Sequence, residues 1–159
     1  MLPYLLIFLA FLADRLSKWW ALSFLDEDGP TQINSFLYVR ETYNRGIAFG
    51  MFQGIGPIVG WLTIAVVVGM VVYLVRLPRQ ERIMRIGLAL VIGGALGNLV
   101  DRVSAGEVLD FIQMPFRTGI FNVADMMIQL GIILVLLATL WSGFKSWHQG
   151  EAEPSSSVL

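Results

Sequence analysis

The chain has 159 residues, of which 56% are hydrophobic and only 14% are charged. Soluble domains carry about 25% charged residues, so this composition predicts a membrane protein. The formal net charge of −1 offers no basic excess for binding nucleic acid. Cysteine is absent, which excludes disulfides and cysteine nucleophiles. The one histidine, His148, lies in the polar C-terminal tail, so a zinc hydrolase would need an almost all-carboxylate site.

Four hydrophobic spans follow one another along the chain. They cover about residues 2–25, 55–75, 83–100 and 123–144. A helix needs roughly 20 residues to cross ~30 Å of hydrocarbon, so each span predicts a transmembrane helix. The first span contains Asp14, Arg15 and Lys18, but it lacks the basic start and the small-residue cleavage site of a signal peptide. We therefore expect it to be retained.

The short loop between the second and third spans predicts the orientation. Its charged residues, with those just beside it, are Arg76, Arg79, Glu81, Arg82 and Arg85. Positively charged loops stay in the cytoplasm, so we expect this loop and both termini to be cytoplasmic. Residues 26–54 and 101–122 then lie on the outer side.

The remaining segments are short. Ile33 to Tyr43 mixes β-branched and aromatic residues with polar ones, which indicates a small strand-rich region in the outer segment. Residues 149–159, with Pro154 and three serines, are predicted to be a disordered cytoplasmic tail. With no internal repeat or domain boundary visible, residues 1–148 are predicted to form one membrane domain.

The predicted topology brings most polar residues of the spans to one depth. Because a helix rises 1.5 Å per residue, Asp14 and Lys18 lie about 18 and 24 Å along the first span, in the outer half of the bilayer. Other polar residues expected in this layer are Asn98, Asp101, Arg102, Asp110, Asn122 and Asp125. This convergence predicts a functional site near the outer leaflet.

Several of these groups also have a structural interpretation. Asp14 and Lys18 are four residues apart, so they share one helix face and can form an ion pair that fixes the docking of the first helix. Asp101 and Arg102 are residue types that a solvated helix end would use in any case. Asp125 suits the first turn of a helix, where the dipole favours an acidic side chain.

Two further patterns in the sequence have structural interpretations. Gly93 and Gly97 form a small-xxx-small pattern that permits close packing of helices. Asn44 and Gly46 are residue types that make turns.

Asp110 has no such structural explanation, because it lies between Leu109 and Phe111 in an apolar stretch. Two carboxylates flanking one short loop can share a proton, which is how aspartic proteases activate water. A proton-coupled transporter also uses membrane carboxylates, but its site usually lies near the midplane between repeats. A non-enzymatic scaffold, whose charges only fix helix packing, would need no second aspartate near Asp110.

Five sequence blocks stand in a distinctive order. They are DRLSK at 14–18, NRGIAF at 44–49, GGALGNLVDR at 93–102, VLDF at 108–111 and FNVAD at 121–125. Together, on a four-span topology, they resemble the lipoprotein signal peptidase (signal peptidase II) family of bacteria. The resemblance covers about Leu5 to Trp141. One departure is that many relatives carry a serine after the second aspartate, whereas Met126 and Met127 follow here.

The resemblance implies an aspartic endopeptidase whose catalytic dyad is Asp110 and Asp125. The residues implied at the substrate site are Asn44, Asn98, Arg102 and Asn122. The residues implied to support the site are Asp14, Lys18, Gly46 and Asp101. The resemblance also implies an all-α membrane fold of four transmembrane helices with a small periplasmic β-rich cradle. No metal or cofactor is expected.

The resemblance further implies the substrate and the location. The substrate would be a prolipoprotein bearing a diacylglyceryl-cysteine, cleaved just before that cysteine to remove the signal peptide. The enzyme would lie in the bacterial cytoplasmic (inner) membrane, with its active site near the outer leaflet. Membrane lipids are the other expected partners, and we expect a monomer.

Overall fold

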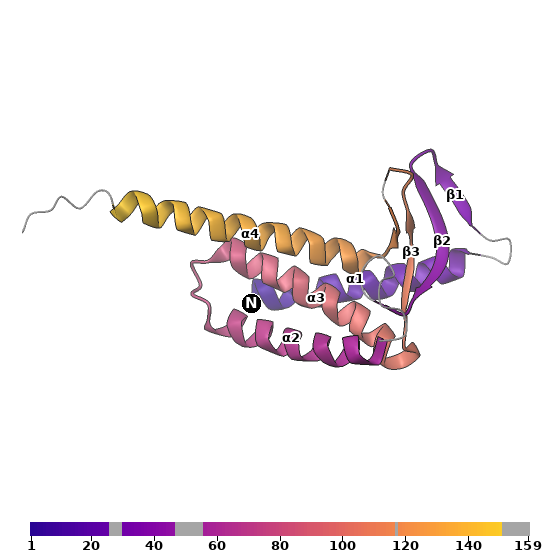
Figure 1. Ribbon diagram of the computed structural model, residues 1–159, viewed down its shortest axis with the longest axis horizontal. Helices are drawn as coiled ribbons and strands as arrows, with labels where there is room; N and C mark the ends of the chain where they lie inside the picture. The colour runs from indigo at the N-terminus through magenta and orange to yellow at the C-terminus, as the bar shows by residue number, and fades with distance from the viewer. Residues whose placement is uncertain (26–29, 47–55, 117, 151–159) are drawn as a thin grey trace, which may run out of the picture.

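Four long helices run side by side, with a small sheet at one end, in the computed structural model (Figure 1), which describes residues 1–25, 30–46, 56–116 and 118–150. The helices are α1 (Leu2–Phe24), α2 (Gly56–Arg76), α3 (Arg82–Ala105) and α4 (Val123–Gly150). A helix therefore covers each predicted hydrophobic span.

Helices α3 and α4 continue beyond the ends of their hydrophobic spans, because hydrophobicity marks the membrane crossing and not the end of a helix. Asp101 and Arg102 consequently lie within α3, one turn before its end at Ala105. His148 lies in the last turn of α4, rather than in a tail. The predicted disordered tail falls outside the described residues from position 151 onward.

Three of the helices are long and apolar enough to cross a membrane. These segments are Val59–Arg76, Arg82–Ala105 and Val123–Lys145. Helix α1 has 23 residues but is not in this group, because its charged residues Asp14, Arg15 and Lys18 lie together near its middle rather than toward its ends. The outer faces of the bundle are apolar: Trp61 and Leu140, for example, are 75% and 69% exposed. Surfaces of this kind suit lipid rather than water.

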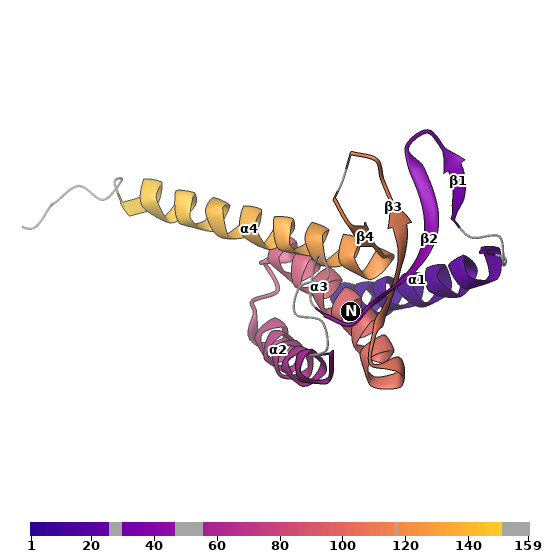
Figure 2. The same cartoon turned by 45° about the vertical axis from the view of Figure 1, so that its right-hand side comes forward.

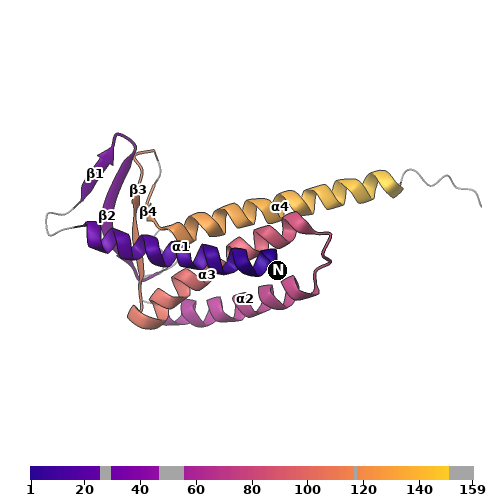
Figure 3. The same ribbon diagram turned by 180° about the vertical axis from the view of Figure 1, so that it is seen from behind.

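Helix α3 is the centre of the bundle, because it packs against α1, α2 and α4. Its buried Leu88 and Ile92 form a core with Val67 and Leu74 of α2. Seen from behind, α1 lies across α3, and the N-terminus is at the end of the bundle away from the sheet (Figure 3).

Two glycines allow α1 and α3 to approach closely. A Cβ atom at Gly93 would lie 2.6 Å from Ala10 Cβ and 2.7 Å from the carbonyl oxygen of Ile7. A Cβ atom at Gly97 would overlap the carboxylate of Asp14. The close packing predicted from the small-xxx-small pattern is therefore confirmed.

The sheet stands away from the bundle where α1 finishes and α4 begins (Figure 2). Its four antiparallel strands, in spatial order, are β1 (Thr31–Asn34), β2 (Leu37–Asn44), β3 (Val108–Gln113) and β4 (Ile120–Phe121). Strands β1 and β2 confirm the strand-rich interpretation of the outer segment.

Strands β3 and β4 lie between the third and fourth spans, where we expected a connecting loop that contains Asp110. That expectation is wrong, because Asp110 lies within β3. Leu109 and Phe111 of β3 are buried in a core with Ala21 of α1 and Val39 of β2. A short apolar strand enclosed by other elements lacks the alternation by which strands are recognised in a sequence.

Replacing Gly93 by Ala should destabilise the protein by about 1–3 kcal/mol, the usual cost of overpacking a tight contact, because the added methyl group meets backbone atoms of α1. The measurement is thermal unfolding in detergent. Gly69→Ala in α2 is the matched control, since a Cβ atom there meets nothing within 4 Å. Equal melting temperatures for the two variants would contradict the close contact.

Candidate active site

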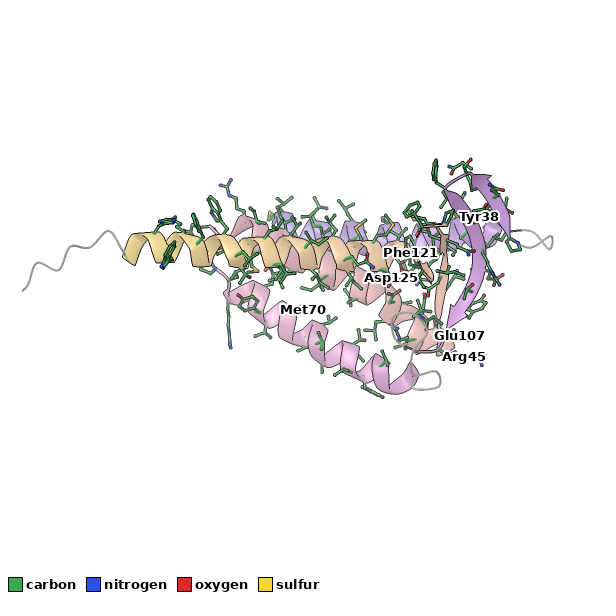
Figure 4. All side chains as sticks on the ribbon, turned by 45° about the horizontal axis from the view of Figure 1, so that its top comes forward. Tyr38, Arg45, Met70, Glu107, Phe121 and Asp125 are labelled. Carbon is green, nitrogen blue, oxygen red and sulfur yellow. The ribbon has the colours of Figure 1, made fainter. Side chains whose placement is uncertain are left out.

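A cavity of about 220 Å³ lies where the sheet meets α3 and α4. Five of the six residues expected in the dyad or the substrate site line it, and they are Asn44, Asn98, Arg102, Asp110 and Asp125. The sixth, Asn122, is fully buried and hydrogen-bonded to Asp110. Figure 4 shows Asp125 near the start of α4, with Phe121 close by beside the sheet. The fold thus gathers residues from β2, β3, α3 and α4 around one space.

Strand alternation directs Asp110 into the cavity. Successive side chains of a strand point to opposite faces. Val108 and Asp110 line the cavity, whereas Leu109 and Phe111 pack into the core on the other face of β3. A carboxylate between two apolar neighbours is therefore explained by the two faces of one strand.

The start of α4 fixes Asp125. The backbone N–H of Asp125 donates to Oδ1 of Asn122 at 2.9 Å, and the backbone N–H of Asn122 donates to Oδ2 of Asp125 at 3.3 Å. This reciprocal arrangement is a capping box, in which the first residue of the helix end and the residue three positions later satisfy each other. Asp125 therefore has both a helix-terminal role and a fixed orientation toward the cavity.

Each carboxylate oxygen of the two aspartates accepts a hydrogen bond from an asparagine. For Asp110, the donors are Nδ2 of Asn122 at 2.7 Å and Nδ2 of Asn44 at 3.3 Å. For Asp125, they are Nδ2 of Asn98 at 2.9 Å and the backbone N–H of Asn122. Neutral amides thus orient both carboxylates without neutralising their charge.

The electrostatic environment of Asp110 favours its protonated form. Burial, and next the charge of Asp125, raise the pKa of Asp110 to about 7, while the hydrogen bonds from Asn44 and Asn122 act in the opposite direction. Asp110 is 4% exposed, so desolvation is the main cause. The contribution of Asp125 means that the two carboxylates interact electrostatically, and the pair can hold one proton near neutral pH.

A buried ion cluster lies behind the cavity. The ammonium of Lys18 is 2.9 Å from Oδ2 of Asp14 and 2.7 Å from Oδ2 of Asp101, and it donates to Oδ1 of Asn98 at 3.1 Å. A lysine ammonium has three N–H donors, so each has a partner. Arg15 forms a second ion pair with Asp101. The ion pair between Asp14 and Lys18 predicted from their spacing is confirmed.

This cluster joins three helices and reaches the aspartates. Asp14 accepts a hydrogen bond at 3.0 Å from the backbone N–H of Ala124, at the start of α4. Oδ1 of Asn98 accepts from both Lys18 and Asn122, while its Nδ2 donates to Asp125. Asn98 therefore connects the structural ion cluster to one of the cavity carboxylates.

Arg102 and Gly46 meet at the edge of the cavity. Nη2 of Arg102 donates to the carbonyl oxygen of Gly46 at 3.3 Å, and the Gly46 N–H donates to Oδ1 of Asn44 at 3.0 Å. The latter bond forms the turn expected from these residue types. Nε of Arg102 is buried and has no hydrogen-bond partner among the described residues. Residues 47–49, which complete the NRGIAF block at 44–49, lie outside the described part of the chain.

Some residues of the site were not identified from the sequence. Gln129 lines the cavity and lies one helical turn after Asp125, so an isolated polar residue at i+4 in an apolar span could have indicated it. Arg15 was likewise not assigned a role, although it adjoins Asp14. Thr118 reaches the cavity only through the fold of its loop, and no local pattern points to it.

Several known proteins are similar to this chain. A family model described as signal peptidase (SPase) II matches residues 6–141. The lipoprotein signal peptidases of Anoxybacillus flavithermus and Geobacillus thermodenitrificans are 40% and 39% identical to this chain. The first alignment covers 99% of this chain and 95% of the relative, and the second covers 84% and 86%.

Two solved structures described as bacterial membrane enzymes have the same fold. Their TM-scores are 0.81 and 0.77, at 25% and 27% sequence identity. The first superposition covers 99% of this chain and 94% of the other, and the second covers 87% and 92%.

Asp14→Asn should lower the stability of the protein by about 3 kcal/mol, the typical effect of removing one partner from a buried ion pair. The substitution keeps the shape of the side chain but deprives Lys18 of one of its two carboxylates. Thermal unfolding in detergent measures the effect, with Glu41→Gln, an exposed carboxylate of β2, as the control. A melting temperature equal to that of the control would contradict a structural role for Asp14.

Proposed function

This chain belongs to the signal peptidase II family, and from that membership we propose that it is a membrane aspartic endopeptidase whose catalytic pair is Asp110 and Asp125. The main support is that both carboxylates line one cavity and that the charge of Asp125, together with burial, raises the pKa of Asp110 to about 7. Perturbed carboxyl groups of this kind, held in a cleft, are typical of catalytic acids and bases.

The proposed substrate is a prolipoprotein whose cysteine carries a diacylglyceryl group, and cleavage occurs just before that cysteine. The name shared by the curated relatives supports the substrate class. The cavity also has apolar lining from Val108, Phe121 and Ile128 beside its polar groups. Such a mixed lining suits a peptide bond that lies at the edge of the hydrocarbon.

In the proposed mechanism, the pair holds one proton, which resides mainly on the more deeply buried Asp110. The ionised carboxylate of Asp125 takes a proton from a water molecule, whose oxygen attacks the carbonyl carbon of the scissile bond. Asp110 hydrogen-bonds to the carbonyl oxygen and stabilises the charge that develops there. The tetrahedral intermediate collapses as the C–N bond breaks and the departing amine nitrogen receives a proton from the pair.

The other polar residues of the cavity orient these groups. Asn44, Asn98 and Asn122 keep the carboxylates in position through the four hydrogen bonds described above. The unpartnered Nε–H of Arg102 is a donor suited to a carbonyl oxygen of the substrate backbone, because a buried donor is costly when it is left without an acceptor. A role for Arg102 in steadying the aspartates is equally compatible with its place in the cavity lining.

We further propose that all four helices cross the membrane. Helix α1 is about 35 Å long at 1.5 Å per residue, which is enough to span the hydrocarbon. Asp14 and Lys18 are 0% and 1% exposed, whereas Phe8 and Leu16 are more than half exposed. Asp14 and Lys18 therefore face the protein, and Arg15 is paired with Asp101 of α3, so the lipid-facing surface of α1 is largely apolar.

The proposed orientation places the arginine-rich loop between α2 and α3 in the cytoplasm of a bacterial cell. The N-terminus lies at the same end of the bundle as this loop, and the sheet lies at the opposite end (Figure 3). The sheet and the aspartate cavity would then lie at the outer leaflet, where a lipid-modified substrate can keep its acyl chains in the bilayer.

Asp110→Asn and Asp125→Asn should each reduce processing by about 10²–10⁴-fold, the range that general acid–base groups contribute, while the protein still folds and inserts. The measurement is the release of signal peptide from a diacylglyceryl-modified precursor by purified protein. Glu41→Gln removes an exposed carboxylate outside the cavity and should retain activity. Near-normal processing by either aspartate variant would refute the assignment of the pair.

The rate should also depend on pH in a defined direction. Because the pKa of Asp110 is about 7, the shared proton is present below that pH and is lost above it, so kcat/KM should fall as the pH rises through 7. Asn44→Ala removes a hydrogen bond that lowers the pKa of Asp110, and the decline should therefore move to higher pH. A decline that stays in place, or moves to lower pH, would contradict this account of Asp110.

A further inference from the structure

A second and larger cavity, of about 480 Å³, lies at the end of the bundle opposite the sheet. It is bounded by the start of α1, the end of α2 and the start of α3. Its polar lining includes Arg79, Arg82 and Arg85, and its apolar lining includes Leu2 and Ile86. None of the described residues that line it carries a carboxylate. Three positive groups therefore share one cavity without a negative group in its wall.

Two of these arginines have no partner among the residues that the structure describes. Arg85 donates to the carbonyl oxygens of Leu74 and Leu77, at 3.0 and 2.7 Å, and so completes the C-terminal end of α2. The side chains of Arg79 and Arg82 make no hydrogen bond or ion pair with the described residues. Both are exposed, so their guanidinium groups are available to an anion.

Backbone groups at the same place add to the attraction. Helix α3 begins at Arg82, and Glu81 before it makes no side-chain hydrogen bond to the helix end. The N–H of Arg82 itself donates to the carbonyl oxygen of Gln80 at 2.8 Å, but the positive end of the helix dipole still favours an anion at this end of α3. A phosphate group in this cavity would therefore meet the positive end of the helix dipole and two free arginines together.

The position of the cavity in the membrane indicates where the anion comes from. Trp141 of α4 is 68% exposed and lines a neighbouring space together with Arg82. Exposed tryptophans collect at the boundary between hydrocarbon and headgroups. Arg82 thus lies at headgroup depth, and the apolar part of the cavity, at Leu2, Val75 and Ile86, adjoins the hydrocarbon.

We propose that this cavity binds an anionic phospholipid of the leaflet opposite the aspartate cavity. Its phosphodiester contacts Arg79, Arg82 and the start of α3, and its acyl chains lie along the apolar residues of α1 and α2. Basic pockets between membrane helices recognise anionic headgroups in this way. The site is independent of the catalytic pair, so it stands whether or not the proposed peptidase activity is correct.

The test uses the full chain in nanodiscs of phosphatidylcholine that contain a small fraction of phosphatidylglycerol, with bound lipid counted by native mass spectrometry. The wild-type chain should retain one phosphatidylglycerol. The double variant Arg79→Gln with Arg82→Gln should bind it about thirtyfold more weakly, because each of the two basic residues contributes about 1 kcal/mol near an anionic surface and about 1.4 kcal/mol corresponds to a factor of ten. A melting temperature close to that of the wild type in phosphatidylcholine alone shows that the variant is folded.

The matched control is Arg76→Gln with Lys145→Gln. It also removes two positive charges near this end of the bundle, but neither residue lines the cavity. Equal loss of phosphatidylglycerol from both double variants would overturn the site in favour of general surface attraction.

Two soluble probes separate a lipid site from a phosphate site. Inorganic phosphate and glycerophosphoglycerol, which has the headgroup without acyl chains, should not raise the melting temperature of the wild-type protein in detergent, whereas phosphatidylglycerol should. Equal stabilisation by either soluble probe would overturn the lipid as the occupant.

Discussion

The buried ammonium of Lys18 is the interaction on which the rest of the structure depends. A charge in a protein interior is tolerated only when its partners replace the water that it has lost. Here the partners are Asp14 of the same helix and Asp101 and Asn98 of α3. This requirement fixes the rotation and depth of α1 against α3, and the absence of side chains at Gly93 and Gly97 makes the necessary approach possible.

The same cluster determines the character of the aspartate cavity. Asn98 stands between Lys18 and Asp125, so a neutral amide, and not a cation, contacts the carboxylate. A cation in direct contact would hold an aspartate in its charged form over the whole physiological range. Asparagines can orient the carboxylates while leaving Asp110 free to exchange its proton near pH 7. The ion cluster thus holds the helices rigidly together, while the asparagines between it and the cavity leave Asp110 able to exchange its proton.

Much of the helical architecture could be predicted from the sequence, because long apolar runs have few alternatives in a membrane protein. The ion pair of Asp14 and Lys18 followed from their spacing. Strand β3 was missed, since its residues are buried on both faces and do not alternate. The extension of α3 beyond Val100 was missed as well, because the span was bounded by its hydrophobicity. The helix itself continues to Ala105 and ends at Gly106, which has a left-handed backbone.

The convergence of the polar residues was predictable as a layer, but their pairing was not. Topology alone brought Asn98, Asp110 and Asp125 to one surface. The individual hydrogen bonds depend on strand register and on the capping of α4, which are set by tertiary contacts. The same holds for Arg15, which pairs with Asp101, and for Gln129, which lines the cavity. The residues next to them in the sequence give little indication of these contacts.

The wide sequence separation within the ion cluster has a consequence for biogenesis. Lys18 and its acceptor Asn98 are 80 positions apart, and Asp14 and its donor Ala124 are 110 apart. During synthesis, α1 emerges long before either partner exists. Its lysine and aspartate, one turn apart, can neutralise each other in the meantime, so the nascent segment need not carry two bare charges into the translocon. Once α3 and α4 have been inserted, this ion pair gains its contacts with Asp101, Asn98 and Ala124 and fixes α1 in the bundle.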